Sequence, residues 1–331
     1  MNLRPSGSLL LSKAIGGFVS YKTAEGLSEK TIASYQMHLK QWIEFQGDKD
    51  IGKITSAEIT KYFAWLHTDY VPKRLSGDKQ PLSPKTLRNI WVTLSALFSW
   101  ASKELHIASP MKDVPSPRFK TPPIEPYTQT EVQAMLKVCL FSKDVQPGNR
   151  KNFVMRLPYG HRDQAIILFL LDTGLRAMEL CSLLIGSVEQ KTGKVEIKHG
   201  SSGGAKGGKG RTVYLGKAAR RALWRYLVDR EDGDEPSAYL FVSKDARPFN
   251  PSSLRQLIQG IADRASVKNA YPHKFRHTFA ITYLRSGGDV FTLQSILGHS
   301  TLDMVRCYAR IADVDVENAH RKASPADNWR L

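Results

Sequence analysis

Six of the seventeen prolines in this 331-residue chain lie within residues 108–126, interleaved with basic side chains. Proline fixes φ and has no amide hydrogen, so we expect no helix or central strand to survive this density. The sequence therefore predicts a stiff, extended, basic linker over 108–126. This linker separates a first domain, residues 1–107, from a second domain, residues 127–322, which a tail of residues 323–331 follows.

The first domain has the pattern of a helical domain without strands. Helix-start signals occur at Ser28, at the capping box Thr55-x-x-Glu58 and at Ser83-Pro84. Each signal precedes a run in which apolar residues recur every three to four positions, as on one face of a helix. We interpret the many aromatic residues of these runs as core packing.

The second domain is expected to combine helices with a small β-sheet. Residues 161–184 predict a buried helix that stops at Gly174 and a short helix that begins near Arg176. Residues 194–199 and 211–215 alternate like strands, and the glycine-rich segment between them is typical of the tip of a β-hairpin. The whole chain is therefore predicted to be mainly α with a small β-sheet.

The net charge of +17 comes from 48 Lys and Arg residues against 31 Asp and Glu residues. An excess this large indicates a polyanionic partner, and we favour nucleic acid over a membrane because no apolar run is long enough to span a bilayer. A basic protein with a merely solvated surface is the alternative. The three cysteines lack C-x-x-C spacing, so neither disulfides nor a zinc site is predicted, and a reducing cytoplasm is expected.

Reactive side chains gather near the C-terminus, where Pro272 suits the first turn of a helix. His273, Arg276 and His277 follow at i, i+3 and i+4, where free backbone amides and the helix dipole favour an anion. His273 and His277 also have the spacing of two zinc ligands, but no glutamate lies between them and the neighbouring cations argue against a metal. We interpret His277, four residues before an apolar isoleucine, as a buried structural histidine and not a catalyst.

A second helix is expected over residues 290–297, closed by Gly298, with His299 in the turn before a helix that carries Tyr308. Arginine, histidine and tyrosine together can bind a phosphodiester, move protons and supply an oxygen nucleophile. Cys307 is also a nucleophile by chemistry, but it projects about 100° away from Tyr308 around a helix.

The pattern H-x-x-R-H, then L-G-H-S, then a tyrosine nine residues after that last histidine resembles the active-site motif of the tyrosine site-specific recombinases, the phage integrase family. His273, Arg276, His299 and Tyr308 each fall on a position of this motif. Any one of these residues alone is a weak signal, whereas all four in order and at the family's spacing are a strong one.

Two upstream elements extend the resemblance. The segment T-G-L-R-x-x-E-L is similar to the first arginine box of the family, which implies that Arg176 lies in the site and that Glu179 orients it. The family carries a catalytic lysine on its β-hairpin, and the segment AKGGKGR implies Lys206, with Lys209 as the alternative. The same glycine-rich segment is not a nucleotide-binding P-loop, because Gly210 replaces the required Ser or Thr and a strand follows.

The resemblance implies DNA cleavage and rejoining by transesterification. Tyr308 would attack the scissile phosphate to form a 3′-phosphotyrosyl bond, while Arg176 and Arg276 bind the non-bridging oxygens. The hairpin lysine would protonate the leaving 5′-hydroxyl. His273 would assist proton transfer at the nucleophile, and His299 would donate a hydrogen bond to the phosphate. Because guanidinium groups would do what metals do in other nucleases, no metal, ATP or other cofactor is implied.

The resemblance also implies the architecture and the partners. Residues 1–107 would form a helical, SAM-like core-binding domain, and residues 127–322 a mixed α+β catalytic domain that closes with it on DNA. The DNA partner would be double-stranded and would carry an inverted-repeat recombination site. Four copies of the chain would form a homo-tetramer on two such sites, which strand exchange would join through a Holliday junction. Accessory DNA-bending proteins would be further partners.

Two other functions are compatible with the resemblance. One is a type IB topoisomerase-like strand transferase that works as a monomer, and the other is a DNA-binding regulator without turnover, which the complete set of motif residues argues against. In the tail, Trp329 and Leu331 have no local core. The resemblance implies that this tail docks on a neighbouring protomer, although docking on its own catalytic domain would bury the same groups.

Overall fold

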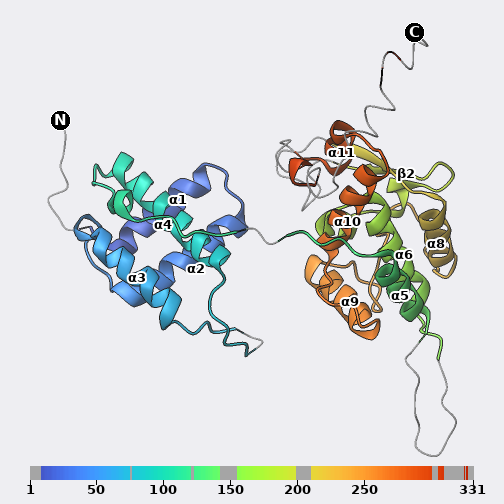
Figure 1. The fold of residues 1–331 in the computed structure, drawn as a ribbon, viewed down its shortest axis with the longest axis horizontal. Helices are drawn as coiled ribbons and strands as arrows, with labels where there is room; N and C mark the ends of the chain where they lie inside the picture. Colours follow the sequence, from blue (N-terminus) through green and yellow to red (C-terminus); the bar gives the residue numbers. More distant parts are fainter. Residues whose placement is uncertain are drawn as a thin grey trace, which may run out of the picture. The chain divides into compact units, whose positions relative to one another are not determined.

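The computed structural model describes residues 9–74, 77–120, 123–141, 155–198, 210–299, 305–308, 324 and 326. The chain divides into two compact units, Met1–Pro122 and Pro123–Leu331 (Figure 1). The division between the units falls inside the predicted linker. In the part of the chain that is described, no helix is both long and apolar enough to cross a membrane.

The first unit is helical, as predicted. Its elements are α1 (Leu11–Ala24), α2 (Glu29–Gln46), the 3₁₀ turn η1 (Ile51–Lys53), α3 (Ser56–Thr68) and α4 (Pro84–Glu104). All three predicted start signals are confirmed. The Ser28 hydroxyl accepts a hydrogen bond from the Thr31 amide at the start of α2. Thr55 and Glu58 form a reciprocal capping box, and Pro84 occupies the first turn of α4. The described residues of this unit contain no strand, only one isolated bridge between Leu10 and Asp50.

The first part of the predicted linker is not extended. Ser109 caps one 3₁₀ turn, η2 (Pro110–Asp113), and Met111 and Val114 are buried in the core of the first unit. Trp91 Nε1 also donates a hydrogen bond to the Val114 carbonyl at 3.2 Å. The prediction that no helix survives the proline density is therefore wrong for this turn. A proline in a first turn supplies a suitable φ and gives up only an amide that would be unpaired anyway.

The second unit surrounds one buried helix. Its helices are α5 (Gln129–Leu140), α6 (Gly160–Thr173), α7 (Ala177–Cys181), η3 (Ile185–Ser187), α8 (Lys217–Val228), α9 (Pro251–Arg264), α10 (Pro272–Arg285) and α11 (Val290–Leu297). Nine of the fourteen residues of α6 are buried, so this helix is covered on all sides. It packs against α5, α8 and α10, which places it at the centre of the unit (Figure 1).

The sheet is small and antiparallel, with the order β1 (Val188–Glu189), β2 (Lys194–Ile197) and β3 (Arg211–Tyr214). Val195 pairs with Val213, and both side chains are buried against the helices. The predicted hairpin of β2 and β3 is thus confirmed. Sequence inspection missed β1 because two residues are too few to show an alternating pattern.

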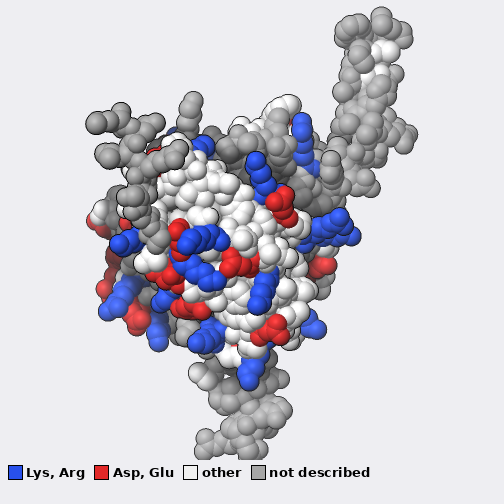
Figure 2. Space-filling model, turned by 90° about the vertical axis from the view of Figure 1, so that its left-hand side faces the viewer, with Lys and Arg blue, Asp and Glu red and all other residues white. Residues whose placement is uncertain are grey.

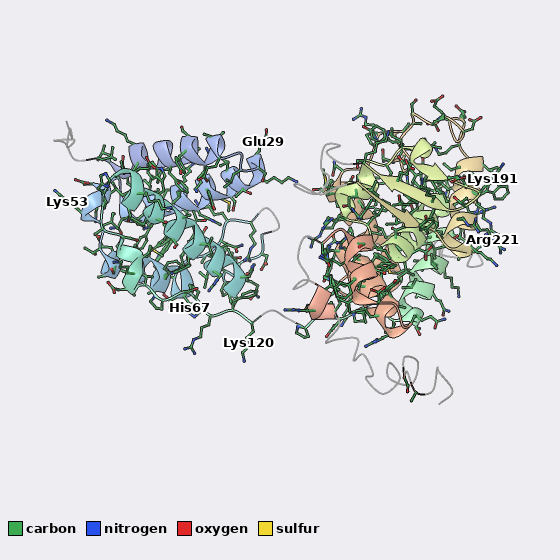
Figure 3. The ribbon with its side chains drawn as sticks, turned by 90° about the horizontal axis from the view of Figure 1, so that it is seen from above. Glu29, Lys53, His67, Lys120, Lys191 and Arg221 are labelled. Atoms are coloured by element: carbon green, nitrogen blue, oxygen red, sulfur yellow. The ribbon has the colours of Figure 1, made fainter. Side chains whose placement is uncertain are left out.

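Basic side chains are interspersed with acidic ones on one face of the molecule and also line an open groove. On the face shown in Figure 2, Lys and Arg lie among Asp and Glu and do not form a single patch. An open groove of about 690 Å³ lies between the β1–β2 turn and α8, lined by Gln190, Lys191, Lys217, Arg220, Arg221, Trp224 and Arg225. Figure 3 shows Lys191 and Arg221 at the same edge of the second unit.

Two glycines end helices where the predicted stops were placed. Gly174 closes α6 with φ 60°, and Gly298 closes α11 with φ 64°. This left-handed conformation is strained for residues with a Cβ atom. At Gly174 a Cβ atom would also lie 2.6 Å from Phe279 Cδ1 and 2.9 Å from Leu297 Cδ2. Both turns therefore require glycine, and at the Gly174 turn a side chain would also clash.

We expect Gly174→Ala to lower the free energy of unfolding by about 1–3 kcal/mol, from backbone strain and overpacking. Urea denaturation gives the value. Gly260→Ala is the matched control, because a Cβ atom at this position of α9 meets nothing within 4 Å. That control should be stabilised by about 0.5–1 kcal/mol, as for other Gly→Ala changes in helices. Equal behaviour of the two variants would contradict this account of Gly174.

Candidate active site

The site is built around a buried carboxylate, Glu179, at the start of α7. Arg176 precedes α7, and its amide donates to Glu179 Oε2 at 2.8 Å while its Nη1 donates to Oε1 at 2.9 Å. Arg211, at the start of β3, binds the same carboxylate through Nη1 at 2.9 Å and Nη2 at 2.7 Å. The expectation that Glu179 orients Arg176 agrees with these contacts, although a second arginine shares the carboxylate.

Arg211 was not among the predicted site residues. It joins three elements, because its Nε donates to the Ile296 carbonyl of α11 at 2.7 Å while its other nitrogens hold Glu179. A signal was present in the sequence. Arg211 is the final arginine of the segment AKGGKGR, which gave the lysine candidates Lys206 and Lys209. Both lysines lie outside the described residues, so their positions stay predictions.

The ion pairs of Glu179 keep it charged inside the protein. Burial alone would raise the pKa of this carboxyl, but the hydrogen bonds and charge of Arg211, together with those of Arg176, outweigh burial and hold the pKa at about 2. Glu179 is 1% exposed, so its charge would be costly without these partners. The carboxylate therefore fixes two guanidinium groups side by side.

Arg276 is fully buried on α10 and is held by helix ends. Its Nη1 donates to the Gly174 carbonyl at 2.9 Å, and its Nη2 donates to the Leu297 carbonyl at 2.7 Å. Its Nε is buried without a hydrogen-bond partner, and among the described residues Arg276 forms no ion pair. Burial, followed by the nearby charge of Arg176, lowers the pKa of Arg276 to about 9. A buried guanidinium in this state is suited to receive an anion.

Arg176 also binds the C-terminal end of α11. Its Nη2 donates to the carbonyl of Gly298 at 3.2 Å, one residue beyond the carbonyl that Arg276 binds. The carbonyls at a helix C-terminus carry partial negative charge and lack partners within the helix. The C-terminal ends of α6 and α11 therefore hold both predicted arginines close together.

Tyr308 lies beside this cluster and is only 3% exposed. The His299 ring stacks on the Tyr308 ring, with centroids 6.2 Å apart and an interplanar angle of 14°. Burial raises the pKa of the Tyr308 hydroxyl. Burial, followed by the charges of Arg276 and Arg176, lowers the pKa of His299 to about 4, and its Nδ1 is buried without a partner. His299 is therefore a neutral imidazole with an unused nitrogen next to the tyrosine.

His277 occupies a different position from the one expected. It is half-buried, and its Nδ1 lies 2.9 Å from the Tyr308 hydroxyl. The interpretation of His277 as a buried structural histidine did not foresee this contact, and the side chain is half-buried instead of buried. Its spacing from an apolar residue suggested burial, but its contact is with a helix distant in sequence, which no local pattern reveals. The exposed His273 packs edge-on against the His277 ring, with centroids 4.5 Å apart.

The structure thus brings together five of the six predicted site residues: Arg176, His273, Arg276, His299 and Tyr308. Cys307, the other nucleophile considered, is exposed whereas Tyr308 is buried. In the described part of the chain, no three His, Cys, Asp or Glu side chains are grouped so that they could hold a metal ion. The chemistry present is that of a cluster of arginines and histidines with a tyrosine beside it.

Replacing Glu179 with glutamine should destabilise the protein in a pH-dependent way. A carboxyl group whose pKa is lower in the folded state than in the unfolded state stabilises the fold at pH values above its unfolded-state pKa. This contribution is lost as the pH falls through the folded-state pKa. We expect the Glu179→Gln variant to be less stable by about 3 kcal/mol near pH 7. The difference from the parent protein should shrink as the pH falls from about 4.5 toward 2, the folded pKa of Glu179.

Urea denaturation at several pH values measures this difference. The exposed Glu231 provides the control, since Glu231→Gln should change stability by less than about 0.5 kcal/mol, with no comparable pH trend. A difference for Glu179→Gln that does not change between pH 7 and pH 3 would contradict the ion-pair account.

Two family profiles match this chain. The N-terminal SAM-like domain of phage integrases matches residues 15–107, and the phage integrase family matches residues 150–314. The tyrosine recombinase XerC of Leptospira interrogans is 26% identical over 319 residues, which cover 95% of this chain and 94% of the relative. A tyrosine recombinase of Agathobacter rectalis is 28% identical over 307 residues, 91% of this chain and 93% of the relative.

Solved structures support the same fold. The Tn1549 transposon integrase in complex with a circular intermediate DNA has a TM-score of 0.70 at 18% identity, covering 91% of this chain and 95% of that chain. The XerH site-specific recombinase bound to a palindromic substrate has a TM-score of 0.65 at 19% identity, covering 97% of this chain and 85% of that chain. The motif residues, the two matching domains and these relatives agree, and the chain belongs to the tyrosine recombinases of the phage integrase family.

Proposed function

We propose that this recombinase cleaves and rejoins DNA strands through a covalent 3′-phosphotyrosyl intermediate, and that two rounds of exchange pass through a Holliday junction. One observation carries the proposal: Arg176 and Arg276 converge on neighbouring carbonyls of the α11 terminus, next to the buried Tyr308. Two guanidinium groups and a tyrosine fit a phosphodiester under attack by an oxygen nucleophile.

Arg176 and Arg276 bind the non-bridging oxygens of the scissile phosphate. Negative charge builds on these oxygens in the pentacoordinate transition state, and cations already fixed in place stabilise it without further reorganisation. The unpartnered Nε of Arg276 and the unpartnered Nδ1 of His299 support this assignment, because both are polar groups that the described residues leave unsatisfied. His299 donates to the phosphate, and His273 takes part in proton transfer at the nucleophile end of the site.

The leaving group needs a proton at the 5′-oxygen. Tyr308 forms a bond to phosphorus, the bond from phosphorus to the 5′-oxygen breaks, and Lys206 protonates that oxygen. Lys209 is the alternative donor. In the rejoining step, the 5′-hydroxyl of a partner strand attacks the phosphotyrosyl bond and releases Tyr308. The bond energy is kept throughout, so the cycle consumes no nucleotide.

The partner is double-stranded DNA that carries an inverted-repeat recombination site. The charge of +17 supports a polyanionic partner, as do solved relatives that are DNA complexes, among them a λ integrase dimer bound to a core site. We propose a homo-tetramer on two DNA sites, aided by accessory DNA-bending proteins. The tail that would link protomers, residues 323–331, lies outside the described residues except for Ser324 and Ala326.

Covalent capture tests the proposal and identifies the target sequence in the same experiment. Nicked duplexes of random sequence are incubated with the protein, adducts that survive SDS are isolated, and the attached DNA is sequenced. We expect the parent protein to capture one inverted-repeat sequence. Tyr308→Phe should capture none, although it binds the recovered DNA nearly as well, because only the nucleophilic oxygen is lost.

Cys307→Ala is the matched control, since it changes the neighbouring nucleophile and should keep full adduct formation. Adducts formed by Tyr308→Phe would remove Tyr308 from the proposed role. Strand exchange between two marked copies of the recovered sequence then distinguishes a recombinase that pairs sites from a monomeric strand transferase.

Adduct formation should persist in EDTA and without nucleotide. The two arginines supply the electrostatic stabilisation that divalent ions supply in metal-dependent nucleases. The measurement is the rate of adduct formation on the recovered DNA with and without EDTA. A strict requirement for magnesium in the cleavage step would contradict this mechanism.

A further inference from the structure

We infer that His277 is the group that takes the proton from Tyr308 when this tyrosine attacks DNA. The inference rests on the function proposed above and adds His277 to the catalytic residues proposed there. Its basis is geometric: His277 Nδ1 lies 2.9 Å from the Tyr308 hydroxyl, within hydrogen-bonding distance.

Tyr308 needs a proton acceptor. Its side chain is 3% exposed, and burial raises the pKa of its hydroxyl above the ordinary value near 10. At neutral pH the hydroxyl therefore keeps its proton, and a neutral phenol is a poor nucleophile. Bulk water has little access to the oxygen, so the acceptor must be a side chain already in contact with it.

His277 has the right protonation state to accept. Burial first, and then the neighbouring His273 and Arg276, lowers the pKa of His277 to about 4, so its ring is neutral at pH 7. A neutral ring with a bare Nδ1 accepts the hydrogen bond from the Tyr308 hydroxyl, and Nε2 then carries the ring proton. Arrival of the negatively charged phosphodiester would favour the imidazolium, so DNA binding would strengthen His277 as a base.

The other two histidines are less well placed for this step. The His273 ring lies against the His277 ring, centroids 4.5 Å apart, and no hydrogen bond joins it to Tyr308 among the described residues. The His299 ring lies nearly parallel to the Tyr308 ring with centroids 6.2 Å apart, and among the described residues the hydrogen-bond partner of the Tyr308 hydroxyl is His277. His273, which is exposed, can follow His277 in the proton's path to solvent.

The step balances in protons and bonds. The Tyr308 proton moves to His277 Nδ1 as the tyrosine oxygen bonds to phosphorus, and the bond to the 5′-oxygen breaks as that oxygen receives a proton from the hairpin lysine. On rejoining, the attacking 5′-hydroxyl gives its proton to the hairpin lysine as it bonds to phosphorus, the bond from phosphorus to the tyrosine oxygen breaks, and His277 returns its proton to Tyr308, which leaves as a neutral phenol. No oxidant, metal or nucleotide enters the step.

Two substitutions distinguish a proton acceptor from a residue that only positions Tyr308. His277→Ala removes the contact, whereas His277→Asn keeps an oxygen near the place of Nδ1 that can accept a hydrogen bond but cannot hold a proton at neutral pH. The readout is the single-turnover rate of adduct formation on the captured DNA. We expect both variants to be slower by about 100-fold or more, the usual contribution of a general base.

A second substrate distinguishes a defect in deprotonating Tyr308 from a defect in protonating the leaving 5′-oxygen. Sulfur in place of the bridging 5′-oxygen leaves without needing a proton, so it rescues defects in the general acid only. We expect this substrate to restore cleavage by Lys206→Ala and to leave both His277 variants slow. Rescue of the His277 variants by sulfur would place His277 at the leaving group and overturn the inference.

Controls keep the outcome interpretable. His161→Ala removes another partly buried histidine of the second unit, one that contacts Asp229 outside the site, and should react at the parent rate. Binding of the captured DNA in a gel-shift assay shows whether each His277 variant is folded, and His277→Gln replaces any variant that is not. A parent-like rate for His277→Asn overturns the inference, whereas absence of any adduct with the parent protein overturns the proposed function itself.

Discussion

The site depends on a buried carboxylate that is shared by two arginines. Glu179 is 1% exposed, and it stays ionised only because Arg176 and Arg211 approach it from two different elements. Removing one partner of such a group leaves a buried charge uncompensated, which is far more costly than losing a surface ion pair. The start of α7 and the start of β3 are therefore fixed relative to each other by electrostatics as much as by packing.

The second constraint comes from helix C-terminal ends. Gly174 and the α11 terminus present carbonyls that no residue of their own helices can satisfy, and Arg276 and Arg176 bind them. Glycine is needed at these ends because the chain turns through the left-handed region there. The same turns that stop the helices thus position the guanidinium groups, so stability and phosphate binding depend on shared residues.

Much of the fold could be predicted from local patterns. The capping box Thr55-x-x-Glu58, first-turn prolines such as Pro272 and the glycine stops gave helix limits that agree with the structure, because these signals act through neighbouring backbone groups. The proline-rich segment was predicted to be wholly extended, yet Met111 is buried in the first core. Ser109-Pro110 is the same cap and first-turn signal as Ser83-Pro84, so the start of this turn follows from local signals, and only its burial in the first core required the tertiary structure.

The sequence by itself determined which chemical groups the site contains, since residue type and spacing along the chain defined the arginines, the histidines and Tyr308. Only the tertiary structure decided which of them touch. It placed His277 on the Tyr308 hydroxyl across 31 positions and Arg211 on Glu179 across 32. Such contacts form where separate elements pack against each other. The periodicity of one helix or strand indicates which of its faces is buried, but not which side chain of another element contacts that face.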